Sequence, residues 1–230
     1  MAQAKLHFKS AHRSSRARRT EKAHSVQTAE LMGEVGFKCI GFNWIPRTIN
    51  MLGAFRSSLP AEIVSSLNTK PARIPSTANI SVIIVRGKAL WKSIYRPFDS
   101  KLESKLAESH PEFPVHILYH EYGALFADPE SGVPVGANVG RVLTSIVAVA
   151  CLRAQGGVGP QVISHVFGLR KAFEDGSAEA EGEVSEGDRW LASDEGGQWL
   201  LGSADGIVDA IGEGNGSGFA TGLDKIKSKL

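Results

Sequence analysis

The sequence contains little cysteine and no long apolar run. Only two cysteines, Cys39 and Cys151, occur among its 230 residues, and they lie far apart. Such a pair can build neither a disulfide framework nor a zinc cluster, and two reduced thiols suit an intracellular protein. The longest apolar stretch, residues 142–152, contains Thr144 and Ser145 and stops before Arg153. We therefore predict no integral membrane segment, so any membrane association must be peripheral.

The sequence also lacks a strong overall charge, since the formal net charge is only +2. This balance does not favour a nucleic-acid partner. The charge is nevertheless uneven: residues 1–20 carry six bases and no acid, whereas residues 174–214 carry twelve acids and one base. The basic segment resembles a mitochondrial presequence in composition, but Leu6 and Phe8 are its only large apolar residues beyond Met1. We predict a disordered basic tail over residues 1–24, with a mitochondrial signal as the alternative.

The apolar pattern of residues 25–211 predicts a single all-α domain. Three-residue and four-residue spacing of apolar side chains indicates helices over residues 28–40, 48–58, 113–126, 139–154 and 160–173. Another helix is expected to open at Gly87, and a last one to run over residues 190–211 with a break at Gly196-Gly197. The run 79–85 fits a strand or a short buried helix, because periodicity cannot separate the two. Residues 212–230 are rich in glycine and predict a flexible tail.

The chain ends in Ser228-Lys229-Leu230. A C-terminal Ser-Lys-Leu is the address that the peroxisomal import receptor reads. This tripeptide predicts a protein of the peroxisome matrix with that receptor as a partner. The basic N-terminal segment leaves open a minor mitochondrial or cytosolic pool.

The most specific block of the sequence runs from residue 140 to residue 172. Gly140-Arg141 opens an apolar, alanine-rich segment that ends at Leu152, a glycine-rich corner follows, and Ser164-His165 leads to Arg170-Lys171-Ala172. This block resembles the core helix pair of the alkylhydroperoxidase-D/carboxymuconolactone decarboxylase superfamily. The resemblance covers residues 85–212, more weakly residues 28–60, and is nearest to a fungal peroxisomal-matrix branch. It implies a helical bundle of that superfamily, no cofactor, and assembly into homo-oligomers such as trimers or hexamers.

The resemblance also indicates which chemistry is missing. Peroxidase members carry a Cys-x-x-Cys before the histidine, and one thiolate attacks the peroxide. The matching positions here are Val158 and Gln161, and residues 141–146 contain no acid to relay protons. Cys151 lies seven residues before the attacking position and is the weakest of the candidates. We therefore predict no thiol peroxidase activity.

The decarboxylase members keep the histidine without the cysteine pair. The resemblance makes His165 the candidate catalytic residue for a proton transfer next to a carboxylate or lactone carbonyl. Arg141 is a candidate clamp for an anionic substrate, and Gln161 and Ser164 are candidate hydrogen-bonding residues. The alternative is a core histidine that a backbone carbonyl satisfies, with capping or surface roles for the other three residues.

A second histidine group is less specific. His116 and His120 lie four residues apart beside Glu121, but no third ligand is placed, so we predict no metal site. Tyr119 and Tyr122 are interpreted as packing residues. Two functions remain: a cofactor-independent decarboxylase or isomerase, and a non-catalytic oligomeric matrix protein that supports peroxisome formation or maintenance. Closed packing around His165 would favour the second, and an accessible pocket with Arg141 pointing inward would favour the first.

Overall fold

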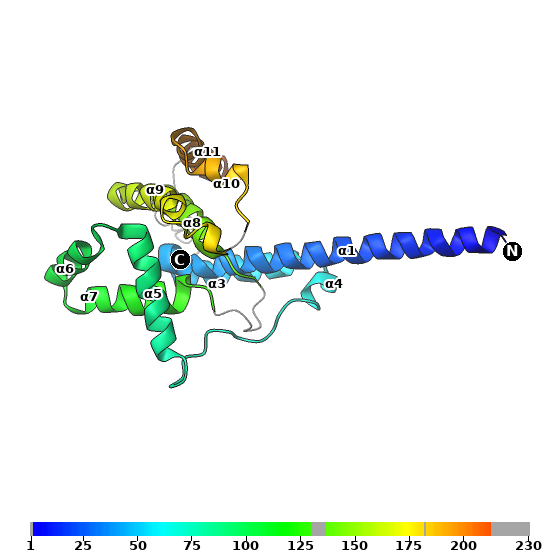
Figure 1. Ribbon diagram of the computed structural model, residues 1–230, viewed down its shortest axis with the longest axis horizontal. Coiled ribbons are helices and arrows are strands. Elements are labelled where there is room, and N and C mark those ends of the chain that lie inside the picture. The colour runs from blue at the N-terminus through cyan, green and yellow to red at the C-terminus, as the bar shows by residue number, and fades with distance from the viewer. Residues whose placement is uncertain (1, 130–136, 182, 213–230) are drawn as a thin grey trace, which may run out of the picture. The chain divides into compact units, whose positions relative to one another are not determined.

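The computed structural model describes residues 2–129, 137–181 and 183–212, and for residues 2–19 it describes the backbone alone. Within these ranges every regular element is a helix, which confirms the all-α prediction. The predicted targeting residues Ser228, Lys229 and Leu230 lie outside the described residues, as does most of the predicted tail. The elements, labelled in Figure 1, are α1 (Ala2–Lys38), α2 (Ile40–Asn43), α3 (Ile45–Ser58), α4 (Ala61–Val64), α5 (Ile80–Tyr95), α6 (Asp99–Ser109), α7 (Glu112–Val115), the π-helix η1 (His116–Phe126), α8 (Gly140–Gln155), α9 (Gly159–Glu174), the 3-10 helix η2 (Glu179–Glu181), α10 (Glu186–Leu191) and α11 (Asp194–Gly212).

The helices form two compact units. Unit 1 takes its described residues from the segments 1–40, 44–74 and 128–139, and unit 2 from 41–43, 75–127 and 140–230. Within unit 1, α1 packs against α3 and α4, and within unit 2, α5, η1, α8, α9 and α11 pack among themselves. One domain over residues 25–211 stays a prediction from the sequence.

Unit 1 is organised along the long helix α1. Residues 2–24, for which the sequence predicts a disordered tail, belong to α1. Helix α3 lies beside the C-terminal half of α1 (Figure 1), where a Cβ on Gly36 would come within 2.7 Å of Met51 and 3.0 Å of Leu52. Lys38 at the end of α1 forms a buried ion pair with Asp128, with Nζ 2.5 Å from the carboxylate. Close packing therefore holds α3 against α1, and the ion pair holds the segment that starts at Asp128 to the end of α1.

A strained residue joins α2 to α3. Trp44 adopts φ 71° and ψ 154°, a region of backbone conformation almost reserved for glycine. Its N–H donates to the Ile40 carbonyl at 3.1 Å, and its own carbonyl accepts from the Thr48 N–H and hydroxyl. Pro46 occupies the first turn of α3, where its missing N–H costs no helical hydrogen bond. These hydrogen bonds hold the Trp44 backbone in place.

In unit 2, α5 and η1 approach each other at two glycines. The run 79–85 is helical, since α5 begins at Ile80, so the strand alternative is wrong. Gly87 lies inside α5, and the prediction that it opens a helix is also wrong. A Cβ on Gly87 would come within 2.6 Å of the Gly123 backbone and the Leu118 carbonyl. Gly87 is thus needed for close contact between the two helices.

The pair α8–α9 is the core hairpin of unit 2. Ala148 and Val149 in α8 are fully buried, as expected of a helix that is apolar nearly all round. Gly156 and Gly157 take positive φ values of 70° and 72° at the corner between the helices. The break in the last helical segment comes between Leu191 and Asp194, ahead of the predicted glycine pair. Gly196 lies in the first turn of α11, against the end of α10. A Cβ on Gly196 would come within 2.0 Å of the Trp190 carbonyl oxygen, so glycine lets α11 begin there.

Candidate functional site

Three side chains from three helices of unit 2 form a hydrogen-bonded chain, here called the His165 cluster. Tyr122 and His165 are buried, and Tyr95 is half-buried. The Tyr95 hydroxyl at the end of α5 lies 2.9 Å from the Tyr122 hydroxyl of η1. The same Tyr95 oxygen lies 3.2 Å from Nε2 of His165 on α9. The hydroxyl of Tyr95 therefore links the other two residues.

Aromatic side chains enclose the His165 cluster. Phe42 presents its ring edge-on to His165, with 6.3 Å between centroids, and stacks on Phe126 at 5.0 Å. The Trp91 ring contacts both tyrosine rings, with 4.1 Å between its centroid and that of Tyr95 and 5.1 Å to that of Tyr122. His165 is only 5% exposed, and its Nδ1 atom is buried without a hydrogen-bond partner in the described structure. Such an atom is costly, because a buried polar group normally has a partner.

Burial sets the ionisation of all three residues. It lowers the pKa of His165 from 6.5 to about 4, with a further contribution from the charge of Arg141. Burial also raises the pKa of Tyr95. The pKa of Tyr122 is raised still more by burial and by its neighbour Tyr95. At neutral pH the cluster is therefore an uncharged imidazole joined to two uncharged phenols.

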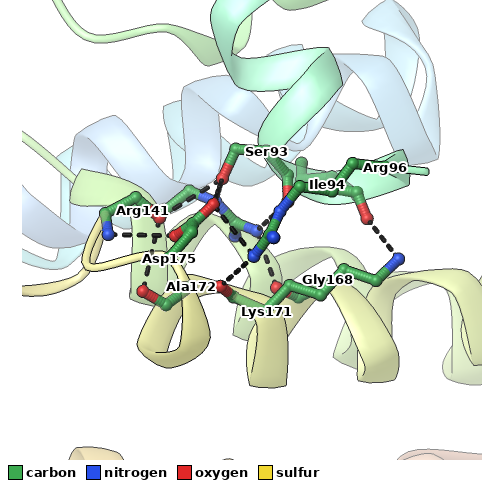
Figure 2. A network of polar contacts seen from close by, with 9 residues as sticks. Ser93, Ile94, Arg96, Arg141, Gly168, Lys171, Ala172 and Asp175 are labelled. Atoms are coloured by element: carbon green, nitrogen blue, oxygen red, sulfur yellow. Dashed lines mark hydrogen bonds and ion pairs between the residues drawn. The ribbon is translucent and has the colours of Figure 1, made fainter.

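Arg141 lies at the start of α8 in a second buried group, the Arg141 cluster. Its Nε donates to the Ser93 hydroxyl at 2.9 Å, Nη1 to the Ser145 hydroxyl at 2.5 Å, and Nη2 to the Gly168 carbonyl at 2.6 Å. Figure 2 shows the guanidinium between the α5 and α9 segments. The side chain is 3% exposed. Arg141 thus connects α5, α8 and α9 through acceptors that belong to the fold.

The polar network continues from Ser93 to the end of α9. Arg96 donates to the Lys171 carbonyl at 2.8 Å and pairs with Asp175 at 3.1 Å, while Lys171 Nζ donates to the Ile94 carbonyl at 3.2 Å (Figure 2). Burial acts to raise the pKa of Asp175, but hydrogen bonds from Ser177 and the charges of Arg96 and Arg141 outweigh it and lower the pKa. The network therefore keeps Asp175 ionised beside the two arginines.

The other two sequence candidates are not part of either cluster. Gln161 lies exposed in the first turn of α9. The Ser164 hydroxyl donates to the Pro160 carbonyl of its own helix at 2.9 Å. Of the four predicted residues, only Arg141 and His165 are buried, and they have different hydrogen-bond partners.

Sequence reasoning missed Tyr95 as a partner of His165 and interpreted Tyr122 as packing alone. Tyr122 does pack, since it is buried against Trp91 and Phe126. The Tyr122 hydroxyl also bonds the Tyr95 hydroxyl, which in turn bonds His165. These residues lie far apart in the sequence, so the sequence alone does not reveal the bonds between them. Only the aromatic residues at the end of α5 and in η1 could have pointed to this chain of hydroxyls.

The cysteines and the paired histidines complete the list of candidate groups. Cys39 and Cys151 are both half-buried, and the Asn43 amide nitrogen lies 3.8 Å from Cys151 Sγ. The His116 and His120 rings lie 5.1 Å apart, and His116 Nε2 is 3.5 Å from Glu121. Across the described residues, no group of three or more His, Cys, Asp or Glu is arranged to hold a metal ion.

None of the helices in the described ranges has the length and apolarity that a membrane crossing needs. Comparison with protein-family models finds no match to the sequence. Searches of the curated proteins and of the solved structures also find no match. The inference of function therefore depends on the residues and their geometry.

Proposed function

We propose that this is a peroxisomal matrix protein with an alkylhydroperoxidase-D/carboxymuconolactone decarboxylase-like bundle, which acts as a non-catalytic homo-oligomeric component supporting peroxisome formation or maintenance. The observation that carries the non-catalytic part is the position of Arg141. Its guanidinium donates to Ser93, Ser145 and Gly168, so the residue expected to clamp an anion is committed to helix packing.

Three further observations support a structural role. His165 is 5% exposed and enclosed by aromatic rings. A histidine with a pKa of about 4 is a weak general base at neutral pH. Val158 and Gln161 stand where a peroxidase would need thiols, so the α8–α9 corner has no redox chemistry of that kind.

The superfamily-like fold remains part of the proposal. It is supported by the buried, apolar α8, the glycine corner and the histidine-bearing α9, which follow one another in the order that the resemblance implies. Homo-oligomer formation follows from the same resemblance, and we expect light scattering to give a mass above 24.6 kDa. A monomer at micromolar concentration would contradict that part.

The location in the peroxisome rests on Ser228-Lys229-Leu230. The test is the position in cells of a fluorescent fusion whose C-terminus is native. We expect peroxisomal fluorescence that becomes cytosolic when Leu230 is deleted. Removal of residues 1–19 in the same fusion is the matched control and should leave import unchanged. Peroxisomal import that survives the Leu230 deletion would contradict the proposal.

A second candidate function is supported by one atom. Nδ1 of His165 is buried and without a partner in the described structure, while Nε2 is bound to Tyr95. A neutral imidazole held in this way could take a proton from the carbon next to a carboxylate or lactone carbonyl, if a substrate reached Nδ1. This favours a cofactor-independent decarboxylase or isomerase as the competing role.

Metabolite profiling of a deletion strain separates the two candidates. The strain is complemented with wild type, with His165→Gln, and with His120→Gln as an exposed histidine control. The non-catalytic role predicts that all three restore the same metabolite profile. Accumulation of one carboxylate, lactone or acyl-thioester in the His165→Gln strain alone, with the variant folded and imported, would overturn this role and support the enzyme.

A further inference from the structure

The first half of α3 exposes apolar side chains next to the Trp44 turn. Trp44 is 76% exposed, Ile45 59% and Ile49 63%. Ile45, Ile49 and Gly53 follow at four-residue spacing, so they lie along one side of the helix. A Cβ on Gly53 would meet no atom within 4 Å, which leaves this side open beyond Ile49. The exposed side chains of Trp44, Ile45 and Ile49 together are here called the α3 patch.

The α3 patch is distinct from the side of α3 that packs within unit 1. Thr48 is buried, and Leu52 and Met51 reach Gly36 of α1. The α3 patch therefore takes no part in the contact between α3 and α1.

The backbone at Trp44 gives the second observation. A tryptophan in a glycine-type conformation is strained, and such strain is typical of functional positions. Here it places the largest apolar side chain on the surface rather than in a core. Glycine would fit this backbone without strain, so packing does not explain a tryptophan at this position.

The chain segment that carries the α3 patch has charged residues of one sign. Residues 35–61 contain no Asp or Glu, and α3 carries exposed Arg47 and Arg56. Arg56 lies on the same side of the helix as Ile45 and Ile49, seven residues after Ile49. Exposed apolar residues with a tryptophan and flanking arginines fit an anionic lipid surface, where the indole lies among the headgroups.

A second copy of the chain is a poorer occupant. A two-fold contact through this side of α3 would place Arg56 against a copy of the same side, which carries no acid to pair with it. Three side chains also expose far less area than the roughly 800 Å² per partner of a stable interface. We propose that the α3 patch docks the protein peripherally on a membrane that contains anionic lipids.

The test is flotation of the full-length protein with vesicles of phosphatidylcholine that contain about 30% phosphatidylserine, compared with pure phosphatidylcholine. We expect the protein to bind the anionic vesicles only. Binding should weaken at about 0.5 M salt, because salt screens the attraction between Arg56 and the lipid headgroups. Ile49→Glu should weaken binding about tenfold or more, because it removes apolar area and adds a repelled charge. Trp44→Gly should weaken binding about fivefold while the protein stays folded, because glycine suits the backbone.

Matched controls come from α11, where Ile207 is 60% and Trp199 56% exposed. Ile207→Glu and Trp199→Ala should bind the vesicles as wild type does. No binding by wild type, or equal binding by Ile49→Glu and Ile207→Glu, would overturn the proposal; the second result would assign the binding to the basic N-terminal residues. Conversion of an oligomer into a monomer by Ile49→Glu, measured by light scattering, would identify a self-association face and also overturn it.

Discussion

The two polar clusters of unit 2 share helices α5 and α9 but use their polar atoms differently. Helix α5 supplies Ser93 to one and Tyr95 to the other, and α9 supplies Gly168 and His165. In the Arg141 cluster the guanidinium donates to acceptors on three helices. In the His165 cluster one ring nitrogen is bound and the other has no partner in the described structure. Proximity in a buried core therefore does not make two candidate residues one site; their hydrogen-bond partners decide their roles.

The largest effect should come from breaking the Arg141 cluster. Arg141→Met leaves the Ser93 and Ser145 hydroxyls and the Gly168 carbonyl without their donor. Each lost buried partner costs about 1–3 kcal/mol, so we expect the free energy of unfolding to fall by about 4 kcal/mol. Urea denaturation measures it. Arg153→Met is the matched control, since Arg153 forms an exposed pair with Asp205, and it should change little. Similar losses in both variants would show that Arg141 does not brace the helices.

A somewhat smaller effect should come from separating the helices that hold the His165 cluster. Gly87→Ala puts a Cβ within 2.6 Å of the Gly123 backbone and should push η1, with Tyr122, away from Tyr95. We expect a loss of about 3 kcal/mol in the free energy of unfolding.

Gly53→Ala is the control for Gly87→Ala, because its Cβ would meet no atom and lies inside helix α3. It should stabilise the protein by about 0.5–1 kcal/mol, since alanine favours the helix. Equal destabilisation by the two substitutions would contradict the close packing of α5 and η1.

The pH dependence of stability should distinguish the clusters. The folded state holds the pKa of His165 near 4, so the unfolded state binds its proton first as pH falls below 6.5. The free energy of unfolding should therefore fall by about 2 kcal/mol between pH 7 and pH 5. Asp175 has a lowered pKa, so its contribution to stability is lost only below this range. His165→Gln should remove the dependence between pH 7 and pH 5; an unchanged dependence would assign it to other groups.

Much of the fold could be predicted from the sequence. Helical spacing identified the cores of α3, α8 and α9, and their observed ends lie close to the predicted ones. The errors fall at glycines. Gly87 and Gly196 serve close contacts between helices, and only the three-dimensional arrangement shows where a backbone needs that space.

The candidate site was predictable only in part. The sequence block of residues 140–172 singled out His165, and His165 is buried. Tyr95 and Ser93 of α5, which bond His165 and Arg141, lie tens of residues away from them in the sequence, so no local spacing could identify them. The bond from Ser164 to the Pro160 carbonyl, in contrast, is a local contact four residues apart within α9.

The central claim is that the His165 cluster is a closed, uncharged part of the core. An NMR titration of the imidazole nitrogens tests it most directly, with the His165 signals assigned by their loss in His165→Gln. We expect His165 to stay neutral from pH 8 to about 5 and to titrate with a pKa of about 4. Titration near 6.5, the value of a solvated histidine, would contradict the account and show that the site is open to water.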